Sequence, residues 1–362
     1  MKRQQKSGWQ TMSRFDRAAL AVTGLLVAAL YGLVASDSLS GGDKSKSVQQ
    51  HLSPPLSPQS ERGALTPAVI SVTAQDLSAL TLAKPYLAKP YNVYALGPAT
   101  KITEVFSTIG YRLQDVRQHG EVPRIFVRNM PADLKQITLP RERKRVFIKL
   151  TLPLILHVND VIRHKRARIL SMQQRTEKGE ALHVEEKAWL SETLTEYGLE
   201  KLDYAALLRR VDVVPPSLAL AQSAEESGWG TSRFAREGNA LFGQRIWKKG
   251  DDAAGIVPEK RPEGEQFRVK AFDHLIDGVK SYARNLNTHF AYKAFREARA
   301  AMRQSGERLN GVDLANALES YSTRGEDYIK TLHTIIRIND LTLFDGARLR
   351  DTLSARRRAP NT

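Results

Sequence analysis

The sequence predicts an α+β protein that is mainly helical and carries one small β-hairpin lobe. From about residue 100 onward, apolar residues recur at helical spacing, as they do in segments 185–197 and 204–211. Residues 266–272 instead alternate between polar and apolar side chains after a turn signal at 262–264, which is typical of a hairpin strand. The 362 residues, 41% of them hydrophobic, are enough to build a packed core.

The N-terminus predicts a membrane helix. Basic residues, among them Lys2 and Arg17, precede an uncharged apolar run from Ala18 to Ala35. Such a run spans about 27 Å as a helix, close to the thickness of the bilayer hydrocarbon, and a basic flank stays in the cytoplasm. We therefore expect a signal anchor in the inner membrane, with the body of the chain in the periplasm. Small residues around Ser36 leave cleavage of a signal peptide as the alternative.

The remaining chain divides by composition. A Ser- and Pro-rich stretch is too poor in large apolar residues to fold alone and is expected to act as a linker. A basic helical segment follows, then a domain, then a basic tail. The expected boundaries are 1–36 for the cytoplasmic tip and anchor, 37–80 for the linker, 81–195 for the basic segment, 196–345 for the domain and 346–362 for the tail.

Positive charge is concentrated in residues 112–175, which hold 15 Lys and Arg against 5 Asp and Glu. This face is either a solvated helical surface or a surface that attracts an anionic polymer or membrane. No nucleic-acid partner is expected, because no recognition motif accompanies the charge. Residues 141–170 predict a long amphipathic segment whose apolar centre is buried in the core. Pro153 predicts a kink or the start of a new helix there.

Composition also limits the chemistry. The chain has no cysteine, which excludes disulfides, thiolate zinc sites and cysteine nucleophiles. Its eight histidines are scattered and form no His-Glu-x-x-His pair. A metal hydrolase therefore has little support, and the acid chemistry of the motif that follows implies no metal and no organic cofactor.

One motif places a carboxyl group beside aromatic and apolar residues. Pro215-Pro216 predicts the start of an Ala- and Leu-rich helix that ends at Glu225-Glu226-Ser227-Gly228-Trp229-Gly230, before the run Asn239 to Gly243. The two glutamates differ by about 100° around the helix, so at most one can face a common cleft. An acid held in apolar surroundings keeps its proton to higher pH and can donate it to a leaving sugar oxygen.

Three ordered motifs carry a resemblance to a known family: Glu226-Ser-Gly-Trp-Gly, Asn239-Ala-Leu-Phe-Gly243, and the run from Tyr321 to Leu332. Together they resemble the glucosaminidase domain of glycoside hydrolase family 73, and within it the Bax-like branch, in which a basic helical segment precedes the domain. The resemblance implies a lysozyme-like α+β fold. It also implies hydrolysis of the β-1,4 bond after N-acetylglucosamine in peptidoglycan strands.

The same resemblance implies roles for single residues. Glu226 matches the general acid and Tyr321 the active-site tyrosine, whereas Tyr328 is expected to be structural. Glu259, in the predicted hairpin, is the candidate for a second carboxylate, and Glu263 and Glu265 lie nearer the turn. The substrate-binding positions implied by the motifs are Trp229, Asn239, Phe242 and Gly243.

Two other functions remain open at this point. The Glu-Ser pair alone is compatible with a lytic transglycosylase or muramidase, although no Gly-Leu-Met-Gln stretch follows it. A non-catalytic envelope scaffold that binds glycan strands through a degenerate cleft is the alternative from another class.

Overall fold

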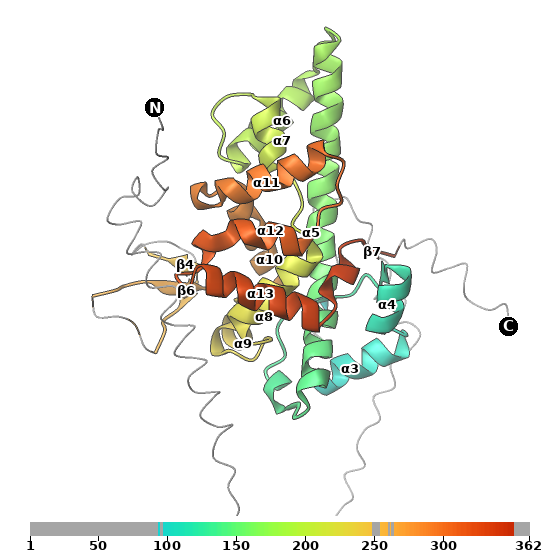
Figure 1. Cartoon of the computed structure of the whole chain (residues 1–362), viewed down its shortest axis with the longest axis vertical. Helices are drawn as coiled ribbons and strands as arrows, with labels where there is room; N and C mark the ends of the chain where they lie inside the picture. Colours follow the sequence, from blue (N-terminus) through green and yellow to red (C-terminus); the bar gives the residue numbers. More distant parts are fainter. Residues whose placement is uncertain (1–92, 95–96, 248–253, 260, 262–263, 351–362) are drawn as a thin grey trace, which may run out of the picture.

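The computed structural model describes residues 93–94, 97–247, 254–259, 261 and 264–350 (Figure 1). The predicted membrane helix, the linker and most of the basic tail lie outside these residues. Within the described ranges, none of the helices combines the length and apolar character needed to cross a bilayer.

The described chain is mainly helical. Its α-helices are α3 (Ala99–Thr108), α4 (Leu113–His119), α5 (Pro140–Glu177), α6 (Val184–Glu196), α7 (Tyr204–Arg210), α8 (Pro216–Ser227), α9 (Arg233–Gly238), α10 (Leu275–Thr288), α11 (Lys293–Gln304), α12 (Gly311–Ala315) and α13 (Glu326–Ile338). The 3-10 helices are η2 (Leu134–Gln136), η3 (Phe290–Tyr292), η4 (Asn316–Tyr321) and η5 (Leu341–Phe344).

Helix α5 is the longest, with 38 residues, and runs along the long axis of the molecule (Figure 1). Its centre is buried, as expected from the apolar run, and it packs on α8 and α10. Lys149 is accommodated within this run because its ammonium group lies over the rings of Phe106 and Tyr111, at 5.7 and 5.8 Å from their centroids. The expectation of a new helix at Pro153 is wrong, since α5 continues through it.

Helix α8 lies at the centre of the fold. It packs against α5, α12, α13 and η5, and nearly all of its residues are buried. An Ala-rich helix suits this place because small side chains let several neighbours approach closely. The helix that ends in the paired glutamates is therefore held on most sides by other helices.

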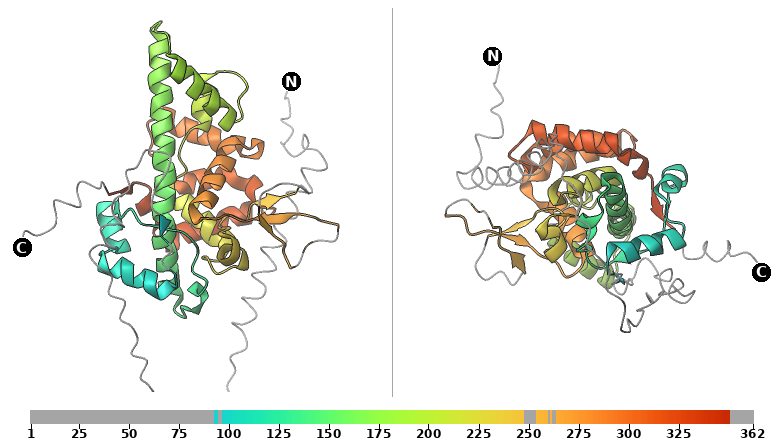
Figure 2. Two further views of the ribbon diagram at one scale, coloured as in Figure 1. Left: turned by 180° about the vertical axis from the view of Figure 1, so that it is seen from behind. Right: turned by 90° about the horizontal axis from the view of Figure 1, so that it is seen from below.

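The predicted hairpin is present and gains a third strand. Strands β4 (Arg245–Ile246), β5 (Gly255–Ile256) and β6 (Arg268–Lys270) form an antiparallel sheet in the order β4-β6-β5. The sheet projects from the helical body on the side of α5 opposite α3 and α4 (Figures 1 and 2). Its contact with the body runs through α9.

Two short parallel pairs close the fold. Strand β1 (Val93–Tyr94) pairs with β3 (Phe126–Val127), and β2 (Glu121–Val122) pairs with β7 (Arg348–Leu349). The second pair joins the beginning and the end of the described chain. The buried core likewise extends from Ala99 to Leu349, across the predicted boundary between residues 195 and 196. That boundary stays a prediction.

Candidate active site

The two ends of α8 are fixed by different means. At its start, the Asp345 carboxylate accepts hydrogen bonds from the backbone N–H and the hydroxyl of Ser217, at 2.8 and 2.7 Å. This contact satisfies a donor of the first turn, as an N-cap does. At its end, Gly228 and Trp229 both adopt left-handed backbone conformations, with φ of 57° and 59°. The helix therefore stops directly after the paired glutamates.

Gly230 completes this turn because nothing larger fits. A Cβ there would lie 2.8 Å from the Met130 sulfur and 2.9 Å from the Phe147 ring. Met130 and Phe147, the latter in α5, thus pack directly against the turn that follows Glu226. This packing fixes the position of the end of α8.

Glu226 is the partly exposed member of the glutamate pair. Burial raises the pKa of its carboxyl group from an ordinary 4.5 to about 7, and the negative charge of Glu225 adds to the rise. A hydrogen bond from Tyr328 and the positive charges of Arg324 and Arg245 oppose it. The carboxyl group therefore exchanges its proton near neutral pH, as a general acid must.

Glu225 points elsewhere. Its carboxylate is buried and accepts a hydrogen bond from Arg324 at 2.7 Å. Arg324 lies in the loop after Tyr321 and also donates to the hydroxyl of Thr331 at 2.6 Å. The two neighbouring glutamates thus separate as their helical spacing predicts, with one in a buried ion pair and the other beside an aromatic cluster.

A tyrosine cluster, made up of Tyr282, Tyr292, Tyr321 and Tyr328, surrounds Glu226. The Tyr282 hydroxyl donates to the amide oxygen of Gln222 at 2.6 Å, and the Gln222 amide donates to the Tyr328 hydroxyl at 3.0 Å. Because Tyr328 already accepts this bond, its own proton is available for Glu226. Tyr328, which the sequence leaves as structural, therefore holds the carboxyl group directly.

Tyr321 packs within the same cluster. Its ring stacks on Tyr328 with centroids 5.6 Å apart and lies 5.7 Å from Tyr292. Its hydroxyl donates to the Phe242 carbonyl at 3.3 Å. The pKa of Tyr321 lies well above its ordinary value, first because of burial and then because of the nearby charge of Glu226. The structure therefore brings Tyr321 beside the acid as a neutral hydroxyl.

The run from Asn239 to Gly243 passes close to the acid. The Phe242 ring stacks on Tyr282 with centroids 3.8 Å apart. Gly243 has φ of +61°, and a Cβ at this position would lie 3.4 Å from a carboxylate oxygen of Glu226. A side chain here would therefore be strained by the backbone and would lie in contact with the acid.

Asn239 and Trp229 make contacts within the protein. The Asn239 amide oxygen accepts from Met130 N–H at 3.0 Å, and its nitrogen donates to the Phe272 carbonyl at 2.9 Å. The half-buried Trp229 ring meets Phe147 edge to face at 5.7 Å, with the Lys144 ammonium group 4.8 Å from its centroid. Both residues position the loops around the site, and their contact with substrate stays a prediction.

The structure places Glu259 apart from this cluster. Its side chain is 81% exposed and pairs with Arg233 of α9 at 3.3 Å. Glu265 on the same lobe is partly buried, and its charge acts on Arg245 together with that of Glu226. Arg245 is thus linked electrostatically to both carboxylates. The sequence shows three glutamates in this lobe but cannot indicate which of them shares Arg245 with Glu226.

Comparison with known proteins places this site in a family. The sequence model of the glucosaminidase family, described as mannosyl-glycoprotein endo-beta-N-acetylglucosaminidase, matches residues 202–341. The chain is also 31% identical to the protein Bax of Escherichia coli (strain K12) over 214 residues, which make up 57% of this chain and 73% of that protein. The chain belongs to the Bax family of glucosaminidase-domain proteins. No solved structure shows a significant match.

The glucosaminidase match gives the site its chemical class. The range 202–341 contains Glu226, the Asn239–Gly243 run and Tyr321 with Tyr328. A glucosaminidase domain indicates a glycoside hydrolase, which fits an acid with a raised pKa in an aromatic setting. Helix α5 lies outside the matched range, although it packs on the helix that carries the acid.

Proposed function

We propose that the protein is a peptidoglycan hydrolase that cleaves the β-1,4 bond after N-acetylglucosamine, with Glu226 as the general acid. The observation that carries this proposal is a pKa of about 7 at a partly exposed carboxyl group surrounded by tyrosines. A group with this pKa is still partly protonated at neutral pH and can protonate a leaving oxygen. The glucosaminidase match supports the choice of the glycan.

The proposed reaction assigns a role to each of these groups. Glu226 gives its proton to the glycosidic oxygen as the bond to the anomeric carbon breaks and positive charge develops on the sugar. The Tyr328 hydroxyl, which is hydrogen-bonded to Glu226, stabilises the carboxylate that remains. Water completes the hydrolysis at the anomeric carbon, either directly or after attack by the substrate's own acetamido group.

We propose Glu265 as the carboxylate that accepts the proton of the attacking water, in preference to Glu259. The support is electrostatic, because Arg245 interacts with both Glu265 and Glu226, whereas Glu259 pairs with Arg233 in solvent. If the acetamido group attacks instead, no second carboxylate has to accept this proton. The effect of Glu265→Gln therefore distinguishes the two routes, and Glu259→Gln is the matched control.

The central experiment is digestion of purified sacculi with the wild-type protein and with Glu226→Gln. This change keeps the shape of the side chain and removes the acid, so release of soluble fragments should fall by about 10²- to 10⁴-fold. The exposed Glu237 of α9 supplies the control Glu237→Gln, which should retain full activity. Undiminished release by Glu226→Gln would refute the assignment of the acid.

Mass analysis of the products tests the bond that is cleaved. A glucosaminidase leaves N-acetylglucosamine at the new reducing end, whereas a lytic transglycosylase leaves anhydromuramic acid and a muramidase leaves muramic acid. A scaffold would bind sacculi without releasing fragments. Each alternative therefore gives a product pattern of its own.

We also propose that residues 18–35 tether the protein to the inner membrane, with the described residues in the periplasm. The support is the apolar run and its basic flank. Protease added to spheroplasts should degrade the described part of the chain, and deletion of residues 1–36 should prevent export. Protection of the chain in intact spheroplasts would contradict this topology.

A further inference from the structure

A groove lined by cationic side chains lies between α7 and α11, and no residue of the tyrosine cluster lines it. It consists of two adjoining pockets of about 520 and 230 Å³ that share Arg209, Ala300 and Gln304. We call it the α7–α11 groove. Its cationic lining residues are Arg166, Arg209, Arg210, Lys293, Arg296, Arg299 and Arg303, and its acidic lining residues are Asp212 and Glu297.

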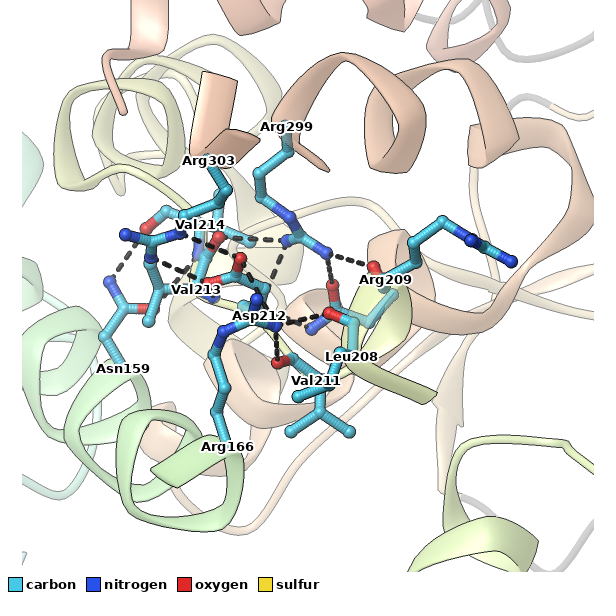
Figure 3. A network of polar contacts seen from close by, with 11 residues as sticks. Asn159, Arg166, Leu208, Arg209, Val211, Asp212, Val213, Val214, Arg299 and Arg303 are labelled. Carbon is cyan, nitrogen blue, oxygen red and sulfur yellow. Dashed lines mark hydrogen bonds and ion pairs between the residues drawn. The ribbon is translucent and has the colours of Figure 1, made fainter. Parts of the chain in front are cut away.

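The acidic residues are already engaged. Asp212 accepts two hydrogen bonds from Arg303, at 3.1 and 2.9 Å, and lies 3.6 Å from Arg166 (Figure 3). Glu297 pairs with Lys293 at 3.5 Å in solvent. The carboxylates that line the groove therefore leave several of its guanidinium groups without an acidic partner of their own.

The cations in this region are also close to one another. Within the described residues, the guanidinium groups of Arg210 and Arg296 donate hydrogen bonds only to backbone carbonyls. The charge of Arg210 also disfavours the charged form of Arg296. Arg299 is fully buried and donates to four acceptors, which are three backbone carbonyls and the side-chain oxygen of Asn287. Neighbouring positive charges repel one another, and an anion bound in the groove would relieve this repulsion.

Arg209 is the cation best placed to meet a ligand. Its backbone carbonyl accepts from Arg299 at 3.0 Å, whereas its guanidinium group points away from the Asp212 network (Figure 3). The side chain is exposed and forms no hydrogen bond or ion pair with the described part of the chain. Lys293 is likewise exposed, at the first position of α11.

The shape of the groove favours an elongated ligand over a single ion. Its lining residues on α11 extend from Lys293 to Gln304, which corresponds to about 16 Å of helix. Four or five residues of extended peptide have this length. Between the cations the wall is formed by small or apolar residues, namely Leu199, Ala206, Ala300 and Ala301. Such a wall suits a backbone with small side chains.

One end of the groove adjoins an element of the tyrosine cluster. Lys293 directly follows Tyr292, whose ring is 5.7 Å from that of Tyr321. Helix α11 also packs against η3 and η4, the elements that carry these two tyrosines. Lys293 is therefore the groove residue that directly adjoins the tyrosine cluster around Glu226.

We propose that the α7–α11 groove binds a short acidic peptide in extended conformation, and that the peptide stems attached to the glycan strands are this ligand. The assignment to stems rests on the proposed function. Carboxylates along the stem pair with Arg209, Arg210 and Lys293, and the small side chains of the stem lie on the apolar wall. The groove thus selects glycan that still carries its peptides.

The direct test is calorimetric binding of the free stem peptide, released from sacculi by an amidase, to the full chain. The double variant Arg209→Ala/Lys293→Ala removes two exposed cations and should bind at least about tenfold more weakly. The control double variant Arg112→Ala/Lys135→Ala removes two exposed cations elsewhere and should bind as the wild type does. Binding should also weaken with added salt.

Chemical and kinetic arms make the outcome decisive. The same peptide with its carboxylates converted to amides should not bind, and pyrophosphate or vesicles of phosphatidylglycerol should not displace the native peptide. KM is then measured for peptide-free and for peptide-bearing glycan strands from sacculi, and the first value is divided by the second. This ratio should fall at least about tenfold in the groove variant and should stay unchanged in the control variant.

Equal binding of the amidated peptide, equal binding by the groove variant, or displacement by vesicles alone would overturn the proposal. Because peptide binding is measured without glycan cleavage, failure of the proposed hydrolase activity would leave this result intact. Conversely, a hydrolase that shows no peptide binding would refute the groove and leave Glu226 in place.

Discussion

Asp212 and Glu226 lie at opposite ends of the segment that contains α8, and burial acts on both carboxyl groups in the same direction. It favours the protonated form in each case, yet the pKa of Asp212 is lowered and that of Glu226 is raised to about 7. At Asp212, hydrogen bonds from Arg303 and the charges of Arg299 and Arg166 outweigh burial. At Glu226, the contacts are mainly tyrosine hydroxyls and rings, and these do not outweigh the effect of burial.

The difference shows how a helix and the loop that leads into it combine a reactive acid with a structural one. Arginines make Asp212 a permanent anion that holds the entry to α8, and Arg299 adds bonds to the carbonyls of Asp212 and Val213. Neutral hydroxyls leave Glu226 free to lose and regain its proton. The comparison predicts that equivalent changes at the two ends have opposite effects on stability.

The largest effect is expected at the structural end. Asp212→Asn leaves the three arginines without their shared anion and should lower the free energy of unfolding by about 3–5 kcal/mol, the usual result of breaking a buried ion pair. Urea unfolding at pH 7 measures this loss. Asp277→Asn, at a 43% exposed side chain, is the control and should change stability little. A loss below about 1 kcal/mol for Asp212→Asn would contradict the role given to this network.

Glu226→Gln should act in the opposite direction, because the pKa of Glu226 is higher in the folded chain than its ordinary 4.5. The stability that comes from binding this proton is complete below about pH 4.5 and is lost as the pH rises to about 7. Glutamine does not ionise and so keeps its stability at high pH. The variant should therefore be more stable than the wild type at pH 8 by up to about 3 kcal/mol. Urea unfolding at pH 4.5 and pH 8 should show the gain only at the higher pH.

The pH dependence of hydrolysis should follow the same group. The acid must be protonated in order to act, so kcat/KM should fall as the pH rises past about 7. Tyr328→Phe removes a hydrogen bond to the carboxylate and should move this fall to higher pH while lowering kcat by about tenfold, or about 1.4 kcal/mol. Tyr111→Phe is the matched control, since the buried Tyr111 hydroxyl has no hydrogen-bond partner in the described structure. An unchanged pH profile of kcat/KM in Tyr328→Phe would show that Tyr328 does not influence the acid.

The smallest effect tests the contact at Gly243. Alanine there should cost about 1 kcal/mol for its left-handed backbone and should also place a methyl group against the Glu226 carboxyl group, where it takes the space of substrate or water. Gly264→Ala meets the same backbone penalty, with φ of +83° and no atom within 4 Å of the added Cβ. Both variants should lose similar stability by thermal unfolding, and only Gly243→Ala should lose activity per folded molecule. Equal activity of the two would show that the contact has no functional weight.

The sequence predicted what depends on local order. Pro215-Pro216 and Gly228 mark the two ends of α8, and the 100° between Glu225 and Glu226 predicts their separation. The hairpin and the buried centre of α5 were likewise predicted, because strand alternation and an apolar run are local patterns. The family was recognisable because its three motifs keep their order along the chain.

What the sequence could not predict depends on contacts between distant segments. Asn239 binds the backbone of Met130 across 109 positions, so its amide serves the fold in a way that its motif does not indicate. Tyr328 looked like an ordinary helix residue until packing brought its hydroxyl to Glu226. The choice between Glu259 and Glu265 depends on how the lobe sheet is paired, and the third strand β4 was not expected.

The packing of α5 has a consequence for how this protein can be cut or fused. A fragment that begins at residue 202 would keep every motif of the family but would uncover the faces of α8 and α10 that α5 shields. It would also lose the partner strand of β7 and the Met130 and Phe147 contacts behind Gly230. Such a fragment should aggregate on expression. The segment matched by the family model should therefore be smaller than the unit that folds, so a stable fragment of this chain should have to include the preceding helices.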